Sequence, residues 1–437
     1  MSRFAHRLAY GVGMAFSASC FTALGMLVQH GGRHALVALC ASFLLMLVVI
    51  AAVSELASLF PSAVGLRTYT KVGIGEFASL IAVVLYLCLV VLVAGIEMRM
   101  FLAVATHVWP QLPPWETTVG VFAVVVVAHL CGWRTAAWVQ TGLVLLLVVS
   151  VVFLAGANFS TAPMEIQSLP ALDLASAIVV GLFLFASVEW ITTLQVRNLQ
   201  DAQGVPRVLL AACALLALLF MCLVAALVQM RERGQAVDLF IPQRAMTNVW
   251  SEPWASAALV SITALAMLST FHAGLACGSR LIHMLSREGF LPSGLGRTNA
   301  AGTPVAAIAA VALACLLGVG LVQRLPSLEG LAEAGALAIS SVYVMYLVSA
   351  ARLRATTRKR AWRTTLLPRW LLWFVATLLT GVMAVTCWEA HRQSRLGLAL
   401  LPWMVAAVAV GLMRIRQLRT RAQALTAKPL IASEQNT

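Results

Sequence analysis

Long apolar runs dominate the chain, and most of them exceed the length of a helix in a soluble protein. Residues 35–60, for example, contain a single charged side chain, Glu55. An α-helix rises 1.5 Å per residue, so about 20 apolar residues cross the roughly 30 Å hydrocarbon core of a bilayer. Runs of this kind predict an all-α integral membrane protein with twelve transmembrane helices, near residues 9–29, 35–60, 76–106, 117–132, 135–156, 173–194, 206–229, 254–284, 304–322, 330–350, 368–388 and 397–415.

Composition and charge agree with this pattern. Hydrophobic residues make up 61% of the 437 and charged residues only 11%, which excludes an ordinary soluble domain. If the N-terminus is cytoplasmic, 22 of the 30 lysines and arginines lie in cytoplasmic segments and seven lie outside. This asymmetry predicts that both termini are cytoplasmic. The net charge of +14 is therefore topological, and no nucleic-acid partner is expected.

No pattern typical of an enzyme is found. The chain has no GxSxG or HExxH sequence, and its nine cysteines fall in or beside apolar runs without metal-ligand spacing. We expect no catalytic residues, no metal and no cofactor.

The first predicted helix has small and polar residues at its centre. Its middle reads YGVGMAFSASCFTALG, residues 10–25. Such a stretch favours either a close-packing face or an interruption of the helix, and membranes tolerate interruptions only where the freed backbone groups face protein or a cavity.

The sixth predicted helix carries a carboxylate near its middle. The stretch FLFASVEWITT, residues 183–193, places Glu189 two residues after Ser187. A charged group at this depth is costly, so it has either a structural partner or a functional role. One reading is a bracing glutamate, and the other is a helix broken around Ala186 and Ser187.

The two candidate breaks are five helices apart. An odd offset inserts two five-helix units in opposite orientations, and paired interrupted helices in inverted repeats are typical of one transporter architecture. The spacing therefore predicts a solute site between the first and sixth helices.

Three segments resemble the amino acid–polyamine–organocation transporters. They cover the second helix and its loop, the sixth helix and its loop, and the end of the eighth helix with the start of the ninth. They read SELASLFPSAVGLRTYTKVGIGEFASL (54–80), FASVEWITTLQVRNLQDAQGVPRVL (185–209) and GSRLIHMLSREGFLPSGLGRTNAAGTPVAAI (278–308).

The resemblance implies a LeuT-like fold of two inverted five-helix repeats with two peripheral helices. Residues 1–350 would then form the transport core, 351–416 a basic cytoplasmic loop with helices eleven and twelve, and 417–437 a polar cytoplasmic tail. The implied substrate positions are Phe16, Ser17, Ala18, Ser19, Cys20, Phe183, Phe185, Ala186 and Ser187. Serines replace three glycines of the family pattern, at Ser17, Ser19 and Ser187, which removes conformational freedom at both breaks.

The energy source is open at this stage. The resemblance implies that sodium could bind at Ser269 and Thr270, while Glu189, Glu97 or His272 could carry a proton, and exchange needs neither ion. Some relatives use a lysine on the fifth helix, but residues 135–156 contain none.

The sequence thus predicts a secondary carrier that moves a small amino acid or related amine across a bacterial inner membrane by alternating access. The partners would be the small-molecule substrate, membrane lipid and a proton or sodium ion. Two alternatives remain: an exporter of the same fold, and a non-transporting sensor or assembly subunit.

Overall fold

All regular structure in the described part of the chain is helical. A computed structural model describes residues 3–60, 64–158, 171–194, 199–232, 250–300, 302–325, 329–356, 367–392, 405–418 and 420. Within these ranges there is no β-strand. The predicted twelfth helix lies partly outside them, and most of the basic loop and the tail after residue 420 lie outside them as well.

Seven of the described helical segments are long and apolar enough to cross a membrane. The longest, Ser19–Leu59, joins two of the predicted helices through a short turn. Three shorter apolar helices accompany them, at Pro114–Leu130, Ala177–Thr193 and Arg369–Val385. The protein is therefore a multi-pass integral membrane protein.

The helix boundaries follow the apolar runs closely. The described helices are α1 (Arg3–Ala15), α2 (Ser19–Gly31), η1 (Gly32–His34), α3 (Ala35–Leu59), α4 (Gly65–Gly73), α5 (Glu76–Val108), α6 (Pro114–Leu130), α7 (Trp133–Asn158), α8 (Ala171–Leu184), η2 (Val188–Thr193), α9 (Leu199–Glu232), α11 (Glu252–Arg287), η3 (Ser293–Gly296), α12 (Val305–Val322), α13 (Glu329–Thr356) and α14 (Arg369–Arg392). A further helix covers 405–418.

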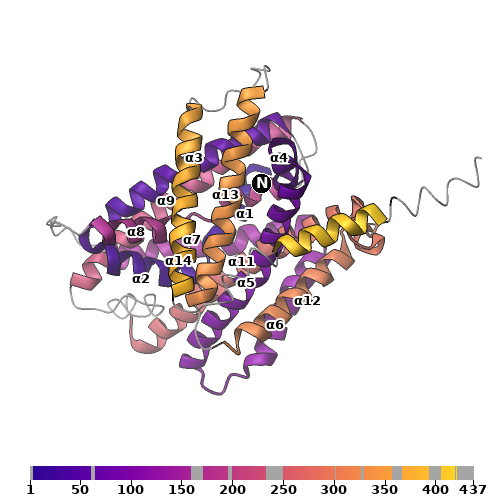
Figure 1. Cartoon of the computed structure of the whole chain (residues 1–437). Coiled ribbons are helices and arrows are strands. Elements are labelled where there is room, and N and C mark those ends of the chain that lie inside the picture. The colour runs from indigo at the N-terminus through magenta and orange to yellow at the C-terminus, as the bar shows by residue number, and fades with distance from the viewer. Residues whose placement is uncertain are drawn as a thin grey trace, which may run out of the picture.

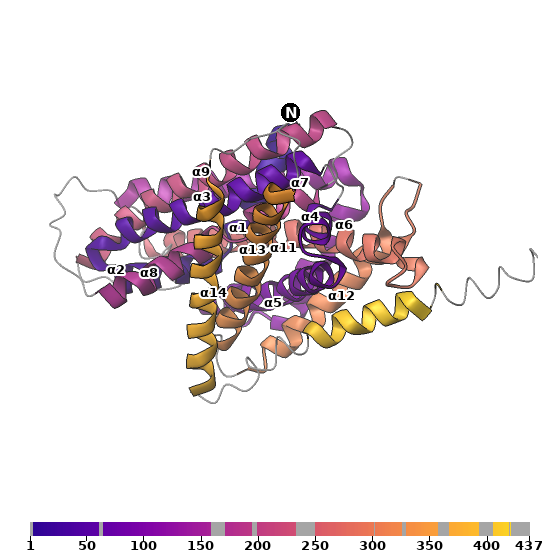
Figure 2. The same cartoon turned by 45° about the horizontal axis from the view of Figure 1, so that its top comes forward.

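The helices form one continuous bundle with the interrupted segments inside it. α3 packs against α8 and α9, and α5 packs against α11 and α12 (Figure 1). α13 and α14 lie side by side in both views, with α13 also packed on α3 and α5 (Figure 2). Among the short helices, α1 packs against α7, α9 and α11, while α2 and α8 pack against each other and against α3.

A buried arginine ties together one end of this bundle. The guanidinium of Arg67, 1% exposed, donates to Glu288 at 2.8 Å, to the Ser79 hydroxyl at 2.6 Å and to Glu76. It also lies 5.3 Å from the centre of the Phe290 ring. A buried charge is stable only when its donors are used. Arg67 thereby links α4, the start of α5 and the end of α11.

The crossing of α5 and α12 depends on two glycines. A Cβ atom at Gly318 would lie 2.4 Å from Val91 Cγ1 and 3.1 Å from the Val91 carbonyl oxygen. A Cβ atom at Gly95 would lie 2.5 Å from Val322 Cγ2. Small residues at such crossings let helix backbones approach closely. The van der Waals packing that results helps to hold helices together in lipid.

We expect Gly318→Ala to lower stability, because overpacking at such a contact costs about 1–3 kcal/mol. Gly320→Ala is the matched control, since a Cβ atom there would meet nothing within 4 Å. Thermal unfolding in detergent, followed by tryptophan fluorescence, should show a lower midpoint for Gly318→Ala only. Equal midpoints for the two variants would contradict the close crossing.

Candidate functional site

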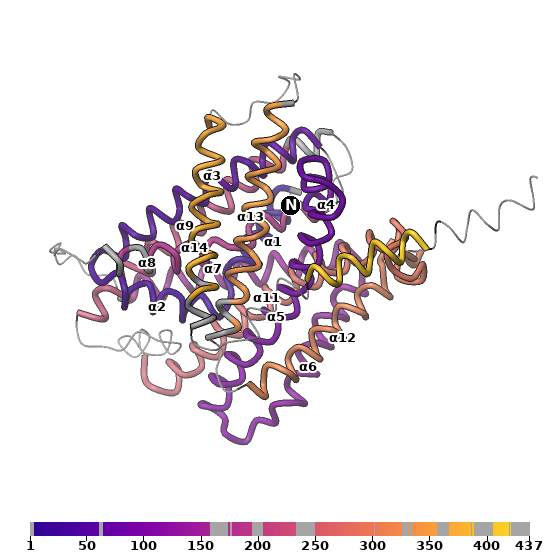
Figure 3. Tube along the Cα trace, viewed as in Figure 1, coloured from indigo at the N-terminus to yellow at the C-terminus, as the bar shows by residue number. Residues whose placement is uncertain are grey.

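The first helix is interrupted between Ala15 and Ser19. The last regular backbone hydrogen bond of α1 runs from the Phe16 amide to the Val12 carbonyl at 2.8 Å. Helix α2 starts at Ser19. In the tube of Figure 3 both helices belong to the indigo end of the colour bar, with the α1 label near the centre of the view and the α2 label toward its left edge. Three of the five positions that the sequence analysis selected in the first helix, Phe16, Ser17 and Ala18, lie between the two helices, and Ser19 and Cys20 begin α2.

The carboxylate of Glu97, on α5, caps the start of α2. Its Oε2 accepts the Ala18 amide at 2.6 Å, and its Oε1 accepts the Ser19 amide at 3.0 Å. Glu97 is fully buried. An anion is favourable at a helix N-terminus, because unpaired N–H groups and the helix dipole both point toward it.

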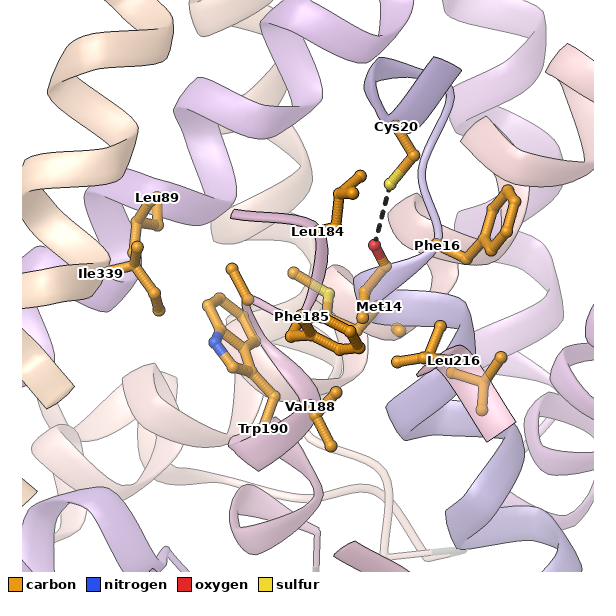
Figure 4. Packing of buried hydrophobic residues seen from close by; sticks show 14 of the residues in the cluster. Met14, Phe16, Cys20, Leu89, Leu184, Phe185, Val188, Trp190, Leu216 and Ile339 are labelled. Atoms are coloured by element: carbon orange, nitrogen blue, oxygen red, sulfur yellow. Dashed lines mark hydrogen bonds between the residues drawn. The ribbon is translucent and has the colours of Figure 1, made fainter. Parts of the chain in front are cut away.

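Several other polar groups of this interruption are paired through side chains. The Ser17 amide donates to Cys20 Sγ at 3.4 Å, and the Cys20 thiol donates to the Ala15 carbonyl at 3.2 Å, drawn as the dashed line in Figure 4. The hydroxyls of Ser17 and Ser19 lie 2.7 Å apart. The interruption is therefore stabilised by side chains that replace the missing helical bonds.

The second interruption separates α8 from η2. α8 ends at Leu184, and η2 begins at Val188 as a 3-10 helix. Ser187, between them, has a φ of 77° and is the one non-glycine residue with positive φ among those described. Its amide donates to the Tyr343 hydroxyl at 3.0 Å. A left-handed conformation costs a serine about 1–2 kcal/mol, so the surrounding contacts must hold it.

Two tyrosines bind Glu189 beyond this interruption. The Tyr343 hydroxyl, from α13, donates to Glu189 Oε2 at 2.9 Å, and the Tyr86 hydroxyl, from α5, donates to Oε1. The Tyr86 ring also stacks on Trp190, with centres 4.5 Å apart. Glu189 is fully buried. Tyr343 therefore connects the strained backbone at Ser187 with the buried carboxylate.

Each half of the first interrupted helix packs against one half of the second. A Cβ atom at Gly11, on α1, would lie 2.3 Å from Ile191 Cδ1 on η2. A Cβ atom at Gly31, on α2, would lie 3.5 Å from the Ala177 Cβ on α8. Helix α1 is thus a neighbour of η2, and α2 is a neighbour of α8.

Aromatic side chains fill the space beside the interruptions. Phe220 of α9 stacks on Phe16 with ring centres 5.1 Å apart and meets Phe185 edge-on at 5.8 Å. Figure 4 shows Phe185 beside Met14, with Val188 and Trp190 following on the same segment. Phe16 and Phe185 are both fully buried. Aromatic rings therefore fill the space beside the interruptions and close it to solvent.

Phe183, grouped with these residues in the sequence analysis, lies elsewhere. It lines a cavity of about 50 Å³ together with Leu45 of α3, Tyr343 of α13 and Leu379 of α14. It is thus separated from the aromatic cluster around Phe16, although Tyr343 joins the two regions.

The candidate sodium ligands meet the first helix. The Thr270 hydroxyl donates to the Gly13 carbonyl at 3.0 Å, and the Ser269 hydroxyl lies 3.4 Å from the same oxygen. The amide of Gln140, on α7, is close enough that a Cβ atom at Gly13 would overlap it at 2.1 Å. The Gln140 amide nitrogen donates to the Ala9 carbonyl of α1 at 3.2 Å.

His272 is not an isolated histidine. Its ring centre lies 4.1 Å from that of His129 on α6, and both rings are buried. Neither ring nitrogen of His272 has a hydrogen-bond partner among the described residues. The His272 ring also lies near the Tyr10 ring, with the two centres 6.0 Å apart.

Several residues of this region were missed by the sequence analysis: Tyr86, His129, Gln140 and Tyr343. A signal for the tyrosines exists, since the chain has only five and four of them, Tyr10, Tyr86, Tyr343 and Tyr346, lie within predicted spans. Glu97 was considered as a proton carrier, and its contact with Ala18 was not expected because 79 residues separate the two in the chain.

Comparisons with known proteins agree with this geometry. A family model described as amino acid permease matches residues 7–412. The chain is similar to a gamma-aminobutyric acid permease of Escherichia coli (strain K12), with 23% identity over 404 residues and 86% of each chain covered. Both matches are to transport proteins rather than enzymes.

We expect Ser187→Gly to raise the thermal midpoint, because glycine adopts φ of 77° without the roughly 1 kcal/mol cost of a side chain. Ser19→Gly is the matched control: Ser19 is helical, so glycine there brings no gain. Equal increases in both variants would contradict the assignment of strain to Ser187.

Proposed function

The chain belongs to the amino acid permease family, and we propose that it is a secondary active transporter that moves a small amino acid or related amine by alternating access. Alternating access requires one solute site that opens to either side in turn. We place this site between the two interruptions.

The observation that supports this proposal most directly is the packing of the two interrupted helices against each other. α1 packs on η2, and α2 packs on α8, so each interruption lies between two short half-helices. Half-helices can tilt separately where one continuous helix would have to move as a rod. Interrupted helices near mid-membrane also present backbone groups to a solute, which a regular helix cannot do.

We further propose the architecture that accompanies this mechanism. Twelve transmembrane helices would comprise two inverted five-helix repeats in residues 1–350 and two peripheral helices in 351–416, with both termini cytoplasmic. The excess of lysine and arginine in alternate connections supports this orientation in a bacterial inner membrane. The substrate positions are those around Ser17, Ser19 and Ser187.

Transport into liposomes tests the proposal. The purified full-length protein is reconstituted, and uptake of radiolabelled small amino acids, gamma-aminobutyric acid and amines is measured under a proton gradient, a sodium gradient or an internal load of the same compound. We expect accumulation above the protein-free control in at least one condition, and the condition identifies the coupling. Binding without movement in every condition would overturn the proposal and favour a sensor.

We expect Tyr343→Phe to lower the transport rate at least about fivefold, because loss of a buried partner costs about 1–3 kcal/mol. The hydroxyl serves both the Ser187 amide and Glu189, so its removal releases the second interruption. Tyr10→Phe is the control, since the Tyr10 hydroxyl has no partner among the described residues. Parental rates in both variants would show that Tyr343 does not control the interruption.

A further inference from the structure

The backbone donors of the first interruption are fully used. Every amide from Phe16 to Phe21 donates to an acceptor of the protein: the Ala18 and Ser19 amides to Glu97, the Ser17 amide to Cys20 Sγ, and the rest to carbonyl oxygens. A carboxylate on the passenger molecule would have to displace Glu97 to reach an N–H group here. The position is already occupied by an anion that belongs to the chain.

The backbone acceptors of the second interruption are open by contrast. Among the described residues, no N–H or O–H group donates to the carbonyls of Phe185 and Ala186. These carbonyls follow the C-terminus of α8, where the helix dipole favours a positive charge. Buried carbonyls normally have a donor, so this segment is suited to a ligand rich in N–H groups.

The charges around the site have the same sign. Glu97 and Glu189 are fully buried, and neither forms an ion pair with a basic side chain in the described ranges. Arg99, two residues from Glu97, instead donates to the carbonyls of Val322 at 3.0 Å and Leu325 at 2.6 Å. The Ser17 and Ser19 hydroxyls also bond to Glu97, and an ammonium group that takes their place can bind the carboxylate while it keeps both amides.

We propose that the passenger is an organic amine without a carboxylate group, and that Glu97 supplies the anion that an amino acid would otherwise bring. This inference rests on the proposed transport function and specifies its substrate class. The ammonium group is bound by acceptors, namely the open carbonyls at Phe185 and Ala186 and the buried carboxylates. A free carboxylate on the ligand is rejected by Glu97 through like charge and through the loss of free amides.

Matched ligand pairs test the proposal on the unmodified protein. Ethylamine is compared with alanine, n-propylamine with gamma-aminobutyric acid, and cadaverine with lysine, so that the members of each pair differ only in a carboxylate. Binding is measured by thermal shift and by competition, and uptake is measured in liposomes. We expect the amines to bind at least about tenfold more tightly than their partners, the effect of one charge-assisted contact.

The variant Glu97→Gln tests the role of this side chain. It keeps the shape but replaces one acceptor oxygen with an NH₂ group, so we expect amine affinity to fall at least about tenfold and the preference over amino acids to shrink. Glu116→Gln, at the exposed start of α6, is the matched control and should leave both unchanged. If Glu97→Gln does not fold, the comparison of ligand pairs on the parent protein still decides.

The outcomes separate this inference from the proposed function. Transport of amino acids with equal or better binding than the amines would overturn the amine assignment while the transporter function stands. Unchanged selectivity in a folded Glu97→Gln protein would also overturn it. If no ligand is bound or moved in any gradient, the proposed function fails and this inference fails with it.

Discussion

The hydrogen bonds from Glu97 to the Ala18 and Ser19 amides are the contact on which the rest of this structure depends. Lipid offers no partner for a freed N–H group, so a helix can stop inside a membrane only if the protein supplies the acceptors. A carboxylate is the strongest acceptor that a side chain provides, and its two oxygens match two successive amides. Without it, the sequence from Ala15 to Ser19 would gain by continuing as a helix.

The second interruption is stabilised by a different chemistry. Ser187 takes a left-handed conformation, and tyrosine hydroxyls from α5 and α13 hold both its amide and Glu189. At the first interruption the Glu97 carboxylate accepts from backbone amides. At the second, tyrosine hydroxyls donate to the Glu189 carboxylate. Helix α5 takes part in both, since it carries Tyr86 and Glu97. Movement of α5 relative to α1 and η2 would therefore affect both interruptions together.

Sequence patterns predicted the helices well because membrane helices depend on length and apolarity, which are local properties. The predicted 35–60 helix is observed as Ala35–Leu59, and the predicted 304–322 helix as Val305–Val322. Twelve crossings and the sidedness of the termini stay predictions. The amphipathic α4, Gly65–Gly73, was not expected, because it is short and lies in a connection.

The site was less predictable, because its contacts join residues far apart in the chain. Ser17, Ser19 and Ser187 stood out through composition and through the resemblance to a family pattern. The partner of Ala18 lies 79 residues away, and that of Ser187 lies 156 residues away, so no spacing rule could identify Glu97 or Tyr343. Phe183 shows the same limit: two residues from Phe185, it lines a cavity with residues of α3, α13 and α14, and its role in substrate binding stays a prediction.

An experimental density map of the purified protein in a lipid nanodisc, resolved to side chains, tests the central claim most directly. The account predicts non-helical backbone between Ala15 and Ser19, with the Glu97 carboxylate within hydrogen-bonding distance of the amides of Ala18 and Ser19. A helix continuous from Arg3 to Gly31, with Glu97 directed elsewhere, would contradict it.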